Sequence, residues 1–244
     1  MRKTTDKPPR RRRGRPPQGG PPVVDEARCL HAALEVFAGL GYEGTSVREI
    51  ARRMGISHGL LNARFGSKHA LWMAAVCHGM DQLHGHMARI EGGPDEQADL
   101  VEQMRRACLN FLLGLVEVPA IIQLMNTEGA RRSERLDHIV ATFFRRRTWR
   151  IHTLLKQGQK AGVFRKLHVA VPFTLLAHGA GALVVLRPLA EAVDARLGKP
   201  SGKLRRAAEE AVDLIVRGLL ARGSPGPGHT SRRSPTRVAR PGRR

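Results

Sequence analysis

Several side chains able to recognise nucleic acid fall within one short stretch of the sequence, SVREIARRMGISHGLLNARFGSKHAL, residues 46–71. They are Arg48, His58, Asn62, Arg64 and Lys68. Lysine and arginine bind phosphates, while arginine and asparagine can also pair with the edges of guanine and adenine. Unless these groups are merely solvated surface residues, the chemistry they offer is DNA recognition.

Two helices of about two turns each must hold these side chains. Ser46 and Glu49 have the spacing of a capping box, which predicts a helix that Gly55 ends. Ser57 then begins another helix, which runs through Phe65. Helices this short are not stable alone, so longer neighbours have to hold them.

Helical periodicity continues on both sides of this pair. One helix is expected over residues 24–40, closed by Gly41, and another begins at Ser67 and runs to residue 90. After the Gly-Gly-Pro break only helical patterns follow, and the expected helices cover 100–115, 133–162, 169–191 (interrupted near Pro188) and 204–220. The fold class predicted is therefore all-α.

The charge of the chain points to an anionic partner. The formal net charge is +21 over 244 residues, with a sequence pI of about 11.5. Residues 1–22 carry eight Lys and Arg against one Asp, and residues 223–244 carry six Arg and no acid. Most of the excess therefore lies in two terminal segments whose composition predicts disorder.

Membrane and secreted proteins are disfavoured by the composition. The three cysteines (Cys29, Cys77 and Cys108) are too few for a disulfide framework and suit buried thiols in a reducing cytoplasm. No apolar stretch follows the basic N-terminus, so no secretory signal is expected. Residues 169–186 carry no formal charge, but Pro172 and His178 favour a buried helix over a membrane span.

Enzyme chemistry is disfavoured as well. The sequence contains no Gly-rich phosphate loop and no nucleophile elbow. Cys77, Asp81 and His84 share one helix face and could hold a transition metal with His78 or His86, but packing and solvated positions are the preferred interpretation. We expect no catalytic residues, no metal site and no cofactor.

The string FAGLGYEGTSVREIA followed by RRMGISHGLLNARFGSKHAL resembles the N-terminal DNA-binding domain of the TetR family of repressors. The resemblance covers residues 23–83. It implies a three-helix DNA-binding domain with a helix-turn-helix over 46–65, followed by an α-helical ligand-binding and dimerisation domain over 84–222. The basic segments 1–22 and 223–244 flank these two domains.

The resemblance also implies a role for particular residues. The DNA-binding set is Thr45, Ser46, Arg48, Ser57, His58, Gly59, Asn62, Arg64 and Lys68. The first two and the last would contact phosphates, Arg48 would reach a base edge, and residues 57–59 would start the recognition helix. The family usually has an aromatic residue where this chain has Asn62, and often His where it has Arg64. The operator sequence therefore cannot be inferred from the operators of relatives.

The N-terminal segment contains RRRRGRPP, residues 10–17, with the core of an AT-hook at Arg13, Gly14, Arg15 and Pro16. Such a segment lies extended in the narrow minor groove of A·T-rich DNA. The alternative interpretation is an arm that binds phosphates without sequence preference. Both interpretations add salt-dependent affinity for DNA.

The resemblance further implies a small-molecule effector and a homodimer. Candidate pocket residues are Met104, Cys108, Phe111, Met125, Phe143, Phe144, Trp149, His152 and His178, although most could be simple packing. Residues 169–191 and 204–220 would form a four-helix bundle with their dimer mates. The small residues Ala177, Gly179, Ala180 and Gly181 would allow close approach.

Two hypotheses about function are consistent with the sequence. The first is a cytoplasmic, nucleoid-associated regulator of transcription, a ligand-responsive repressor that binds a palindromic operator on double-stranded DNA as a homodimer. The second is an architectural DNA-binding protein that acts mainly through its arginine-rich tails, without sequence preference. Neither the effector nor the operator can be identified from the residues.

Overall fold

The computed structural model describes residues 25–91, 98–145, 149–198 and 202–221. Within these ranges the chain is helical, and the only strand-like feature is an isolated bridge between Phe164 and Leu220. The prediction of an all-α fold is confirmed. The predicted basic arm (1–22) and basic tail (223–244) lie outside the described residues.

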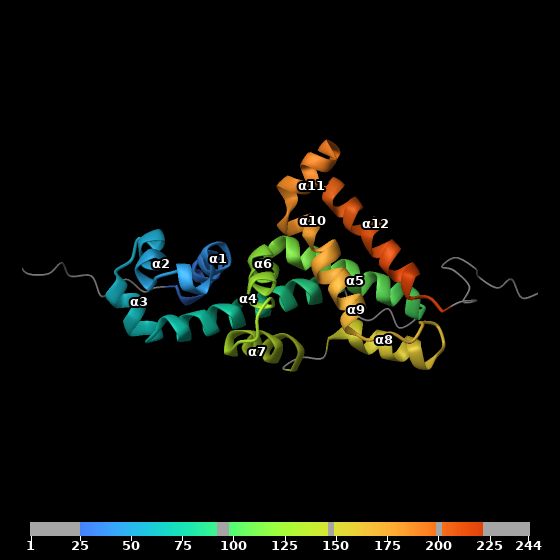
Figure 1. Cartoon of the computed structure of the whole chain (residues 1–244), viewed down its shortest axis with the longest axis horizontal. Helices are drawn as coiled ribbons and strands as arrows, with labels where there is room; N and C mark the ends of the chain where they lie inside the picture. The colour runs from blue at the N-terminus through green and yellow to red at the C-terminus, as the bar shows by residue number, and fades with distance from the viewer. Residues whose placement is uncertain (1–24, 92–97, 146–148, 199–201, 222–244) are drawn as a thin grey trace, which may run out of the picture.

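Three helices gather at one end of the molecule and pack against the start of a fourth (Figure 1). In chain order they are α1 (Glu26–Gly44), α2 (Val47–Met54), α3 (His58–Phe65) and α4 (Lys68–Glu91). Asp25, Ser46, Ser57 and Ser67 each accept a hydrogen bond from a backbone N–H in the first turn that follows. The prediction that helices begin at Ser46, Ser57 and Ser67 is therefore confirmed.

Two local predictions need correction. Gly41 does break the helical geometry, with φ 73° and ψ 167°, but one more turn follows it and α1 ends at Gly44. The capping box is only half formed. Ser46 accepts from the Glu49 N–H at 3.1 Å, but the Glu49 carboxylate turns instead to Arg52 and Arg53.

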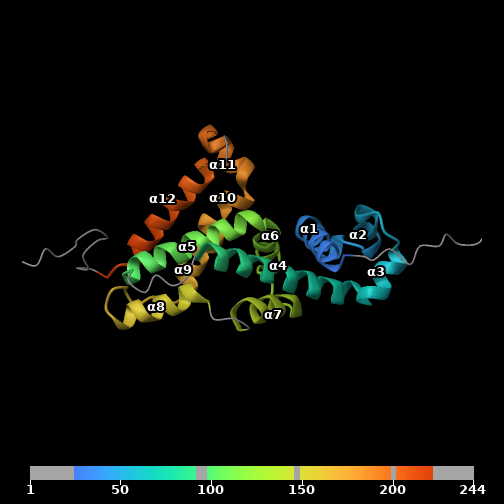
Figure 2. The ribbon, with the colours of Figure 1, turned by 180° about the vertical axis from the view of Figure 1, so that it is seen from behind.

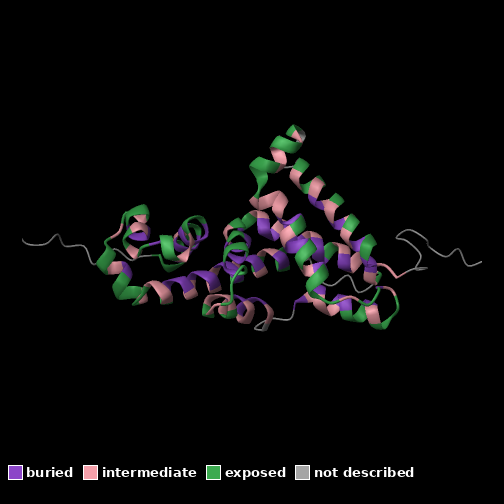
Figure 3. Cartoon of the chain, viewed as in Figure 1, coloured by how far each residue is buried: buried purple, intermediate pink, exposed green. Residues whose placement is uncertain are grey.

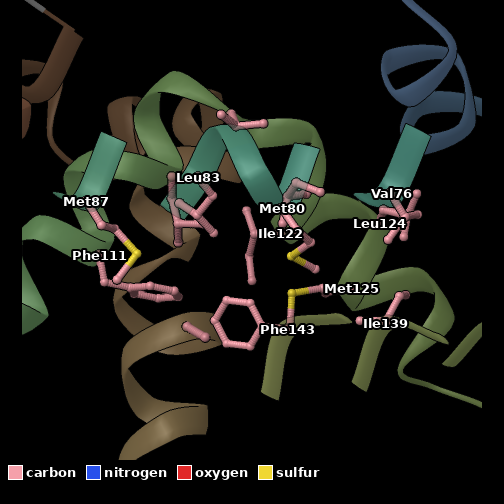
Figure 4. Close-up of a cluster of buried hydrophobic side chains, with 14 of the residues drawn as sticks. Val76, Met80, Leu83, Met87, Phe111, Ile122, Leu124, Met125, Ile139 and Phe143 are labelled. Atoms are coloured by element: carbon pink, nitrogen blue, oxygen red, sulfur yellow. The ribbon is translucent and has the colours of Figure 1, made fainter. Parts of the chain in front are cut away.

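The long helix α4 joins the two halves of the molecule. It runs from α3 into the centre, where it packs on α5 (Leu100–Glu117) and α6 (Pro119–Glu128). Side chains from α4, including Met80 and Leu83, meet Phe111, Met125 and Phe143 in one buried cluster (Figure 4). Residue 83, the predicted end of the DNA-binding domain, lies inside this unbroken helix.

The expected single helix over 133–162 is wrong. Ser133 caps α7 (Glu134–Val140), but the chain then forms a π-helical turn over Ala141–Arg145. A separate helix, α8 (Arg150–Lys160), begins after residues 146–148. The π turn places Phe143 in the core, where it contacts the rings of Phe111 and Trp149.

The interruption expected near Pro188 within residues 169–191 is present, but this segment is divided further. Its parts are α9 (Ala170–Thr174), a π-helical segment (Leu175–Ala180), α10 (Ala182–Val185) and α11 (Arg187–Val193). A bend of 81° separates Ala170–Val185 from α11. A short 3-10 turn, Ala195–Gly198, precedes α12 (Gly202–Leu219), which packs along α5 and agrees with the prediction for 204–220.

The helices α10 and α11, with the adjoining end of α12, project from the body of the molecule, as both views of the ribbon show (Figures 1 and 2). No residue of α11 is buried, and exposed positions cover its surface (Figure 3). By contrast, Ala177, Ala180 and Gly181 are buried against their own chain. The small residues expected at a dimer contact are therefore used mainly for internal packing.

None of the helices in the described ranges is by itself long and apolar enough to span a membrane. Two strongly bent pairs reach the length and composition together, α5 with α6 and Ala170–Val185 with α11.

Candidate nucleic-acid interface

Helices α2 and α3 meet through a turn that requires glycine. Gly55 lies in the left-handed region, with φ 66° and ψ 26°, where a side chain would be strained. The Ile56 N–H donates to the Ala51 carbonyl at 3.1 Å and closes the end of α2. The chain can then turn within three residues and start α3 at Ser57.

A large buried apolar side chain anchors each of these short helices. Ile50 of α2 and Leu61 of α3 are almost completely buried in the core that they share with α1 and α4. Polar residues next to these anchors face outward, and Arg48, His58 and Asn62 are all exposed. The structure therefore brings the predicted α2 and α3 residues to one end of the molecule, on elements whose orientation is fixed by burial.

Arg48 is available for an external partner. Its side chain is exposed, and no acidic group of the described residues forms an ion pair with it. One turn later, Arg52 and Arg53 share the Glu49 carboxylate at 2.9 and 2.8 Å. These hydrogen bonds, that of Arg52 first, lower the pKa of Glu49 from 4.5 to about 2, so the carboxylate stays ionised at neutral pH.

The residues that begin α3, the candidate recognition helix, are exposed to solvent. The Ser57 hydroxyl accepts from the Leu60 N–H at 3.1 Å, and Gly59 adds no side chain to the exposed face. A backbone without side-chain cover can approach a ligand closely. His58 and Asn62 stand four residues apart and so lie on the same face.

Arg64 is held by an internal partner that the sequence did not suggest. Its guanidinium donates to the carboxylate of Glu26, in the first turn of α1. Both side chains are about half exposed, so the pair can open toward solvent. Arg64 can therefore reach DNA only after it leaves Glu26.

Lys68 sits at the start of α4, half-buried against an aromatic ring. Its Nζ lies 4.3 Å from the centroid of the Tyr42 ring, a cation–π contact. The Ser67 hydroxyl caps the same helix by accepting from the Ala70 N–H at 3.0 Å. An ammonium beside a helix N-terminus is a suitable place for a phosphate.

Thr45 does not suit its expected role. Only 3% of the residue is exposed, and its hydroxyl donates to the Gly41 carbonyl at 2.7 Å. That bond satisfies a carbonyl left open at the end of α1, which explains why the side chain turns inward. A phosphate contact through this hydroxyl is ruled out in this conformation, whereas the neighbouring Ser46 remains exposed.

The predicted minor-groove arm, Arg13 to Pro16, lies outside the described residues.

The predicted ligand-pocket residues separate into two groups. Met104, Cys108, Trp149 and His152 line one small cavity of about 10 Å³. Phe111, Met125 and Phe143 are buried in the central cluster, where Phe111 and Phe143 meet edge to face (Figure 4). Phe144 is partly buried beside Trp149, and His178 bonds to Asn126 near the surface.

The alternative metal site does not form from the described residues, which contain no group of three His, Cys, Asp or Glu able to hold an ion. The Cys77 sulfur lies 3.5 Å from Nε2 of His138, and His84 Nδ1 lies 2.6 Å from the Met80 carbonyl. His86 contacts Arg89.

Sequence reasoning missed three residues that bear on the interface: Glu26, Tyr42 and Arg135. Each acts across a large separation along the chain, through the pairs Glu26–Arg64 and Arg135–Tyr42. No pattern of neighbouring residues in the sequence predicts contacts of this kind. The i, i+4 periodicity reveals only neighbours on one helix.

Comparisons with known proteins agree with this geometry. Residues 30–75 match the family described as bacterial regulatory proteins, tetR family. A relative from Bacillus subtilis (strain 168), an uncharacterized HTH-type transcriptional regulator, YezE, is 42% identical over 52 residues. That match covers 21% of this chain and 27% of the relative.

Solved structures extend the likeness to the whole described fold. A fatty acid metabolism regulator described as putative, from Clostridium perfringens, is 22% identical with a TM-score of 0.58, over 79% of this chain and 98% of that one. HlyIIR, a hemolysin II transcriptional regulator, is 23% identical with a TM-score of 0.54, over 79% and 94%. The ketosteroid transcriptional regulator KstR2 of Mycobacterium tuberculosis is 20% identical with a TM-score of 0.53, over 79% and 93%. At these identities the likeness establishes the fold alone.

Proposed function

Because the chain belongs to the TetR family of bacterial regulatory proteins, we propose that it regulates transcription by binding a specific DNA site through α2, α3 and the start of α4. Family membership places it among regulators rather than enzymes, as the sequence predicted. The observation that carries the proposal is the exposed polar face of α2 and α3, opposite the buried anchors Ile50 and Leu61. A short helix held this way can enter a major groove.

The proposed roles follow the exposure of each side chain. Arg48 reaches a base edge from α2, and Ser57, His58, Gly59 and Asn62 present the start of α3 to the groove. Ser46 and Lys68 contact phosphates on either side. Arg64 binds guanine or a phosphate once it is released from Glu26.

The domain division is proposed as residues 23–83 for DNA binding and 84–222 for effector binding and dimerisation. The first part contains all the residues assigned to DNA. The second contains the small cavity beside Trp149 and the helices α10 to α12. The output proposed is repression that is relieved when a small molecule binds the second part.

A homodimer is supported by apolar side chains left uncovered on the projecting helices. Leu189, Val193 and Leu214 are all strongly exposed on α11 and α12. Large apolar side chains left exposed in this way suit a protein interface. Two-fold symmetry would pair the two α3 helices with the half-sites of a palindromic operator.

Control by an effector requires a difference in affinity between two conformations. A ligand must favour a conformation in which the two α3 helices no longer fit successive major grooves. Linkage then requires that the ligand bind more weakly when operator DNA is present.

Fluorescence anisotropy tests sequence-specific binding. The duplex upstream of the chain's own gene is compared with a scrambled duplex, over a salt series, for the wild type and for Arg48→Ala/Lys68→Ala. We expect the upstream duplex to bind about a thousandfold tighter and the double variant to lose that margin. The matched control, Lys156→Ala/Arg165→Ala, removes two exposed charges outside the interface and should keep it.

The architectural alternative predicts the opposite result. Both duplexes would bind alike, with a steep salt dependence that the α2 and α4 substitutions leave unchanged. Deleting residues 1–22 would then abolish most binding. In the proposed regulator the same deletion weakens binding to every duplex but preserves the preference for the operator.

A further inference from the structure

A second basic surface lies at the end of the molecule opposite the proposed DNA-binding helices. It is formed by α8 and the stretch that follows it, and both ribbon views place α8 and α3 toward opposite ends of the described chain (Figures 1 and 2). The helix α4, which leads from α3 to the centre, is itself about 36 Å long, at 1.5 Å per residue over 24 residues. A duplex bound to α3 therefore does not cover this second surface.

Four exposed cations form this surface, which we call the α8 basic surface: Lys156, Lys160, Arg165 and Lys166. The two lysines of α8 are four residues apart and so lie on the same face of the helix. The side-chain amide of Gln159 donates to the carbonyls of Arg165 and Leu167, at 3.2 Å each. These bonds hold residues 165–167 against α8 next to Lys160, so the four charges gather in one place.

No carboxylate in the described part of the chain forms an ion pair with these four cations. Residues 138–190 contain nine Lys and Arg and no Asp or Glu. The nearby helices α5 and α12 do carry acids, but Asp213 of α12 already pairs with two arginines and Glu102 of α5 with a third, all within 3.2 Å. The positive charge of the α8 basic surface is therefore left for an external anion.

The chain carries more positive charge from the same end. Ala221, the last described residue, donates its N–H to the Val163 carbonyl at 2.9 Å, two residues before Arg165. The segment over residues 223–244, which follows closely, contains six Arg and no acid. A polyanion attracted to the α8 basic surface therefore meets the attachment point of a further basic segment.

The composition of the surface suits a nucleic-acid backbone better than a protein or a membrane. Among the described residues 156–168 no large apolar side chain is exposed. Protein interfaces usually bury an apolar or aromatic centre, and helices that lie on membranes insert apolar side chains. Closely spaced cations without such anchors are typical of contacts to the phosphates of duplex DNA.

We propose that the α8 basic surface binds the phosphates of a second DNA duplex, without sequence preference, while α2 and α3 hold the operator. One protein would then join two segments of DNA. The proposal rests on the proposed function for the first duplex only, because the second duplex is bound by different residues.

Capture of a second duplex on a biosensor tests this proposal. The biotinylated upstream duplex is immobilised, saturated with full-length protein and then exposed to the scrambled duplex over a salt series. We expect the wild type to capture the scrambled duplex with a dissociation constant of about 1–100 µM, the range of binding without sequence preference.

The variant Lys156→Gln/Lys160→Gln/Lys166→Gln removes three phosphate contacts from the α8 basic surface. We expect it to bind the scrambled duplex at least tenfold more weakly. The slope of log affinity against log salt should become shallower by about 2.7, since each contact to duplex DNA contributes about 0.9. Loading of the variant on the immobilised operator shows that it is folded.

A matched control removes three exposed cations elsewhere. Arg131→Gln/Arg132→Gln/Lys203→Gln lowers the net charge by the same amount, outside the α8 basic surface, and should weaken capture less than threefold. Equal losses in the two variants would show that net charge, or the terminal basic segments, captures the duplex, and would overturn the proposal. Absence of capture by the wild type would overturn it as well.

The same sensor distinguishes other partners and separates this proposal from the proposed function. Vesicles of phosphatidylcholine and phosphatidylserine replace the scrambled duplex in a parallel run, and capture of vesicles without capture of DNA would contradict the proposal. Preferential loading on the operator without capture of a second duplex supports the proposed function alone. Equal loading on operator and scrambled duplexes, with capture that only the α8 variant loses, contradicts operator preference but supports the second surface.

Discussion

The guanidinium of Arg135 lies 4.2 Å from the centroid of the Tyr42 ring, on which the ammonium of Lys68 also rests at 4.3 Å. Tyr42 belongs to the last turns of α1, Arg135 to α7 and Lys68 to the start of α4. Arg135 also bonds to the buried Glu128 carboxylate at 2.9 Å. One aromatic ring thus connects the end of α6 to the lysine proposed to hold a phosphate.

Removing the ring should weaken both stability and DNA binding. Tyr42→Leu abolishes two cation–π contacts, each of about 0.5–1 kcal/mol at a partly exposed site, and frees Lys68 to leave its position. We expect operator affinity to fall several-fold, measured by anisotropy. Tyr42→Phe is the matched control, because it keeps the ring and should behave like the wild type. Equal losses in the two variants would show that the hydroxyl, and not the ring, matters.

Arg135 should also stabilise the buried carboxylate of Glu128. Arg135→Met leaves that carboxylate without its guanidinium, and we expect a loss of about 2–3 kcal/mol in the free energy of unfolding, measured by urea denaturation. Adding Glu128→Gln removes the uncompensated charge and should restore part of the loss. A double variant as unstable as Arg135→Met alone would contradict this explanation.

The DNA-binding half could be predicted closely because its signals are local. Ser46, Ser57 and Ser67 each cap the helix that follows within the next three residues, and Gly55 supplies the left-handed conformation that the turn between α2 and α3 needs. Such features depend only on residues that are close together in the sequence. The contacts of Arg64 with Glu26 and of Lys68 with Tyr42 could not be predicted in this way, because they depend on how α1 lies across α3 and α4.

In the second half of the chain, helical periodicity alone does not predict the backbone correctly. Residues 133–162 carry a continuous helical pattern, yet they contain a π-helical turn and a break. In residues 169–191 the interruption near Pro188 was expected, but the π-helical segment was not. The turns place Phe143 and Leu176 in the core, so tertiary packing determines the local backbone. The helix α6 was missed as a separate element, although Pro119 at its first position suits a helix start.

Glu26 should act as an internal competitor for DNA. Glu26→Gln removes the carboxylate that holds Arg64, and we expect operator affinity to rise about threefold in anisotropy, since Arg64 no longer has to leave an ion pair. The effect requires Arg64, so Glu26→Gln/Arg64→Gln should match Arg64→Gln alone.

The matched control changes the same charge elsewhere on α1. Glu35 is exposed and pairs only weakly with His31, at 3.5 Å. Glu35→Gln should raise affinity less than Glu26→Gln, through net charge only. Equal effects of the two substitutions would show that general electrostatics, and not the release of Arg64, explains the gain.

Glu49 should give α2 a defined pH dependence. Its pKa is held near 2, below the ordinary value of 4.5, by the hydrogen bonds from Arg52 and Arg53. A lowered carboxyl pKa contributes stability that is complete above pH 4.5 and is lost as the pH falls toward 2. The difference in thermal midpoint between wild type and Glu49→Gln should therefore be constant from pH 8 to pH 6 and shrink below pH 4.5. A difference that stays constant down to pH 3 would contradict the assignment.

The proposed dimer contact can be broken by one charge. Leu214 on α12 is 75% exposed, and Leu189 and Val193 of α11 are also uncovered. Burying a carboxylate there without a partner is strongly unfavourable, so Leu214→Glu should shift the mass in light scattering from twice the 26.9 kDa chain to the single chain.

The same substitution should weaken binding to a two-half-site operator far more than to a single half-site, because only a dimer engages both at once. Leu40→Glu is the matched control, since it adds the same charge at an exposed leucine of α1, away from α11 and α12. It should leave the mass unchanged. If Leu214→Glu keeps the mass and the operator affinity of the wild type, the exposed face of α11 and α12 is not the surface that joins two copies.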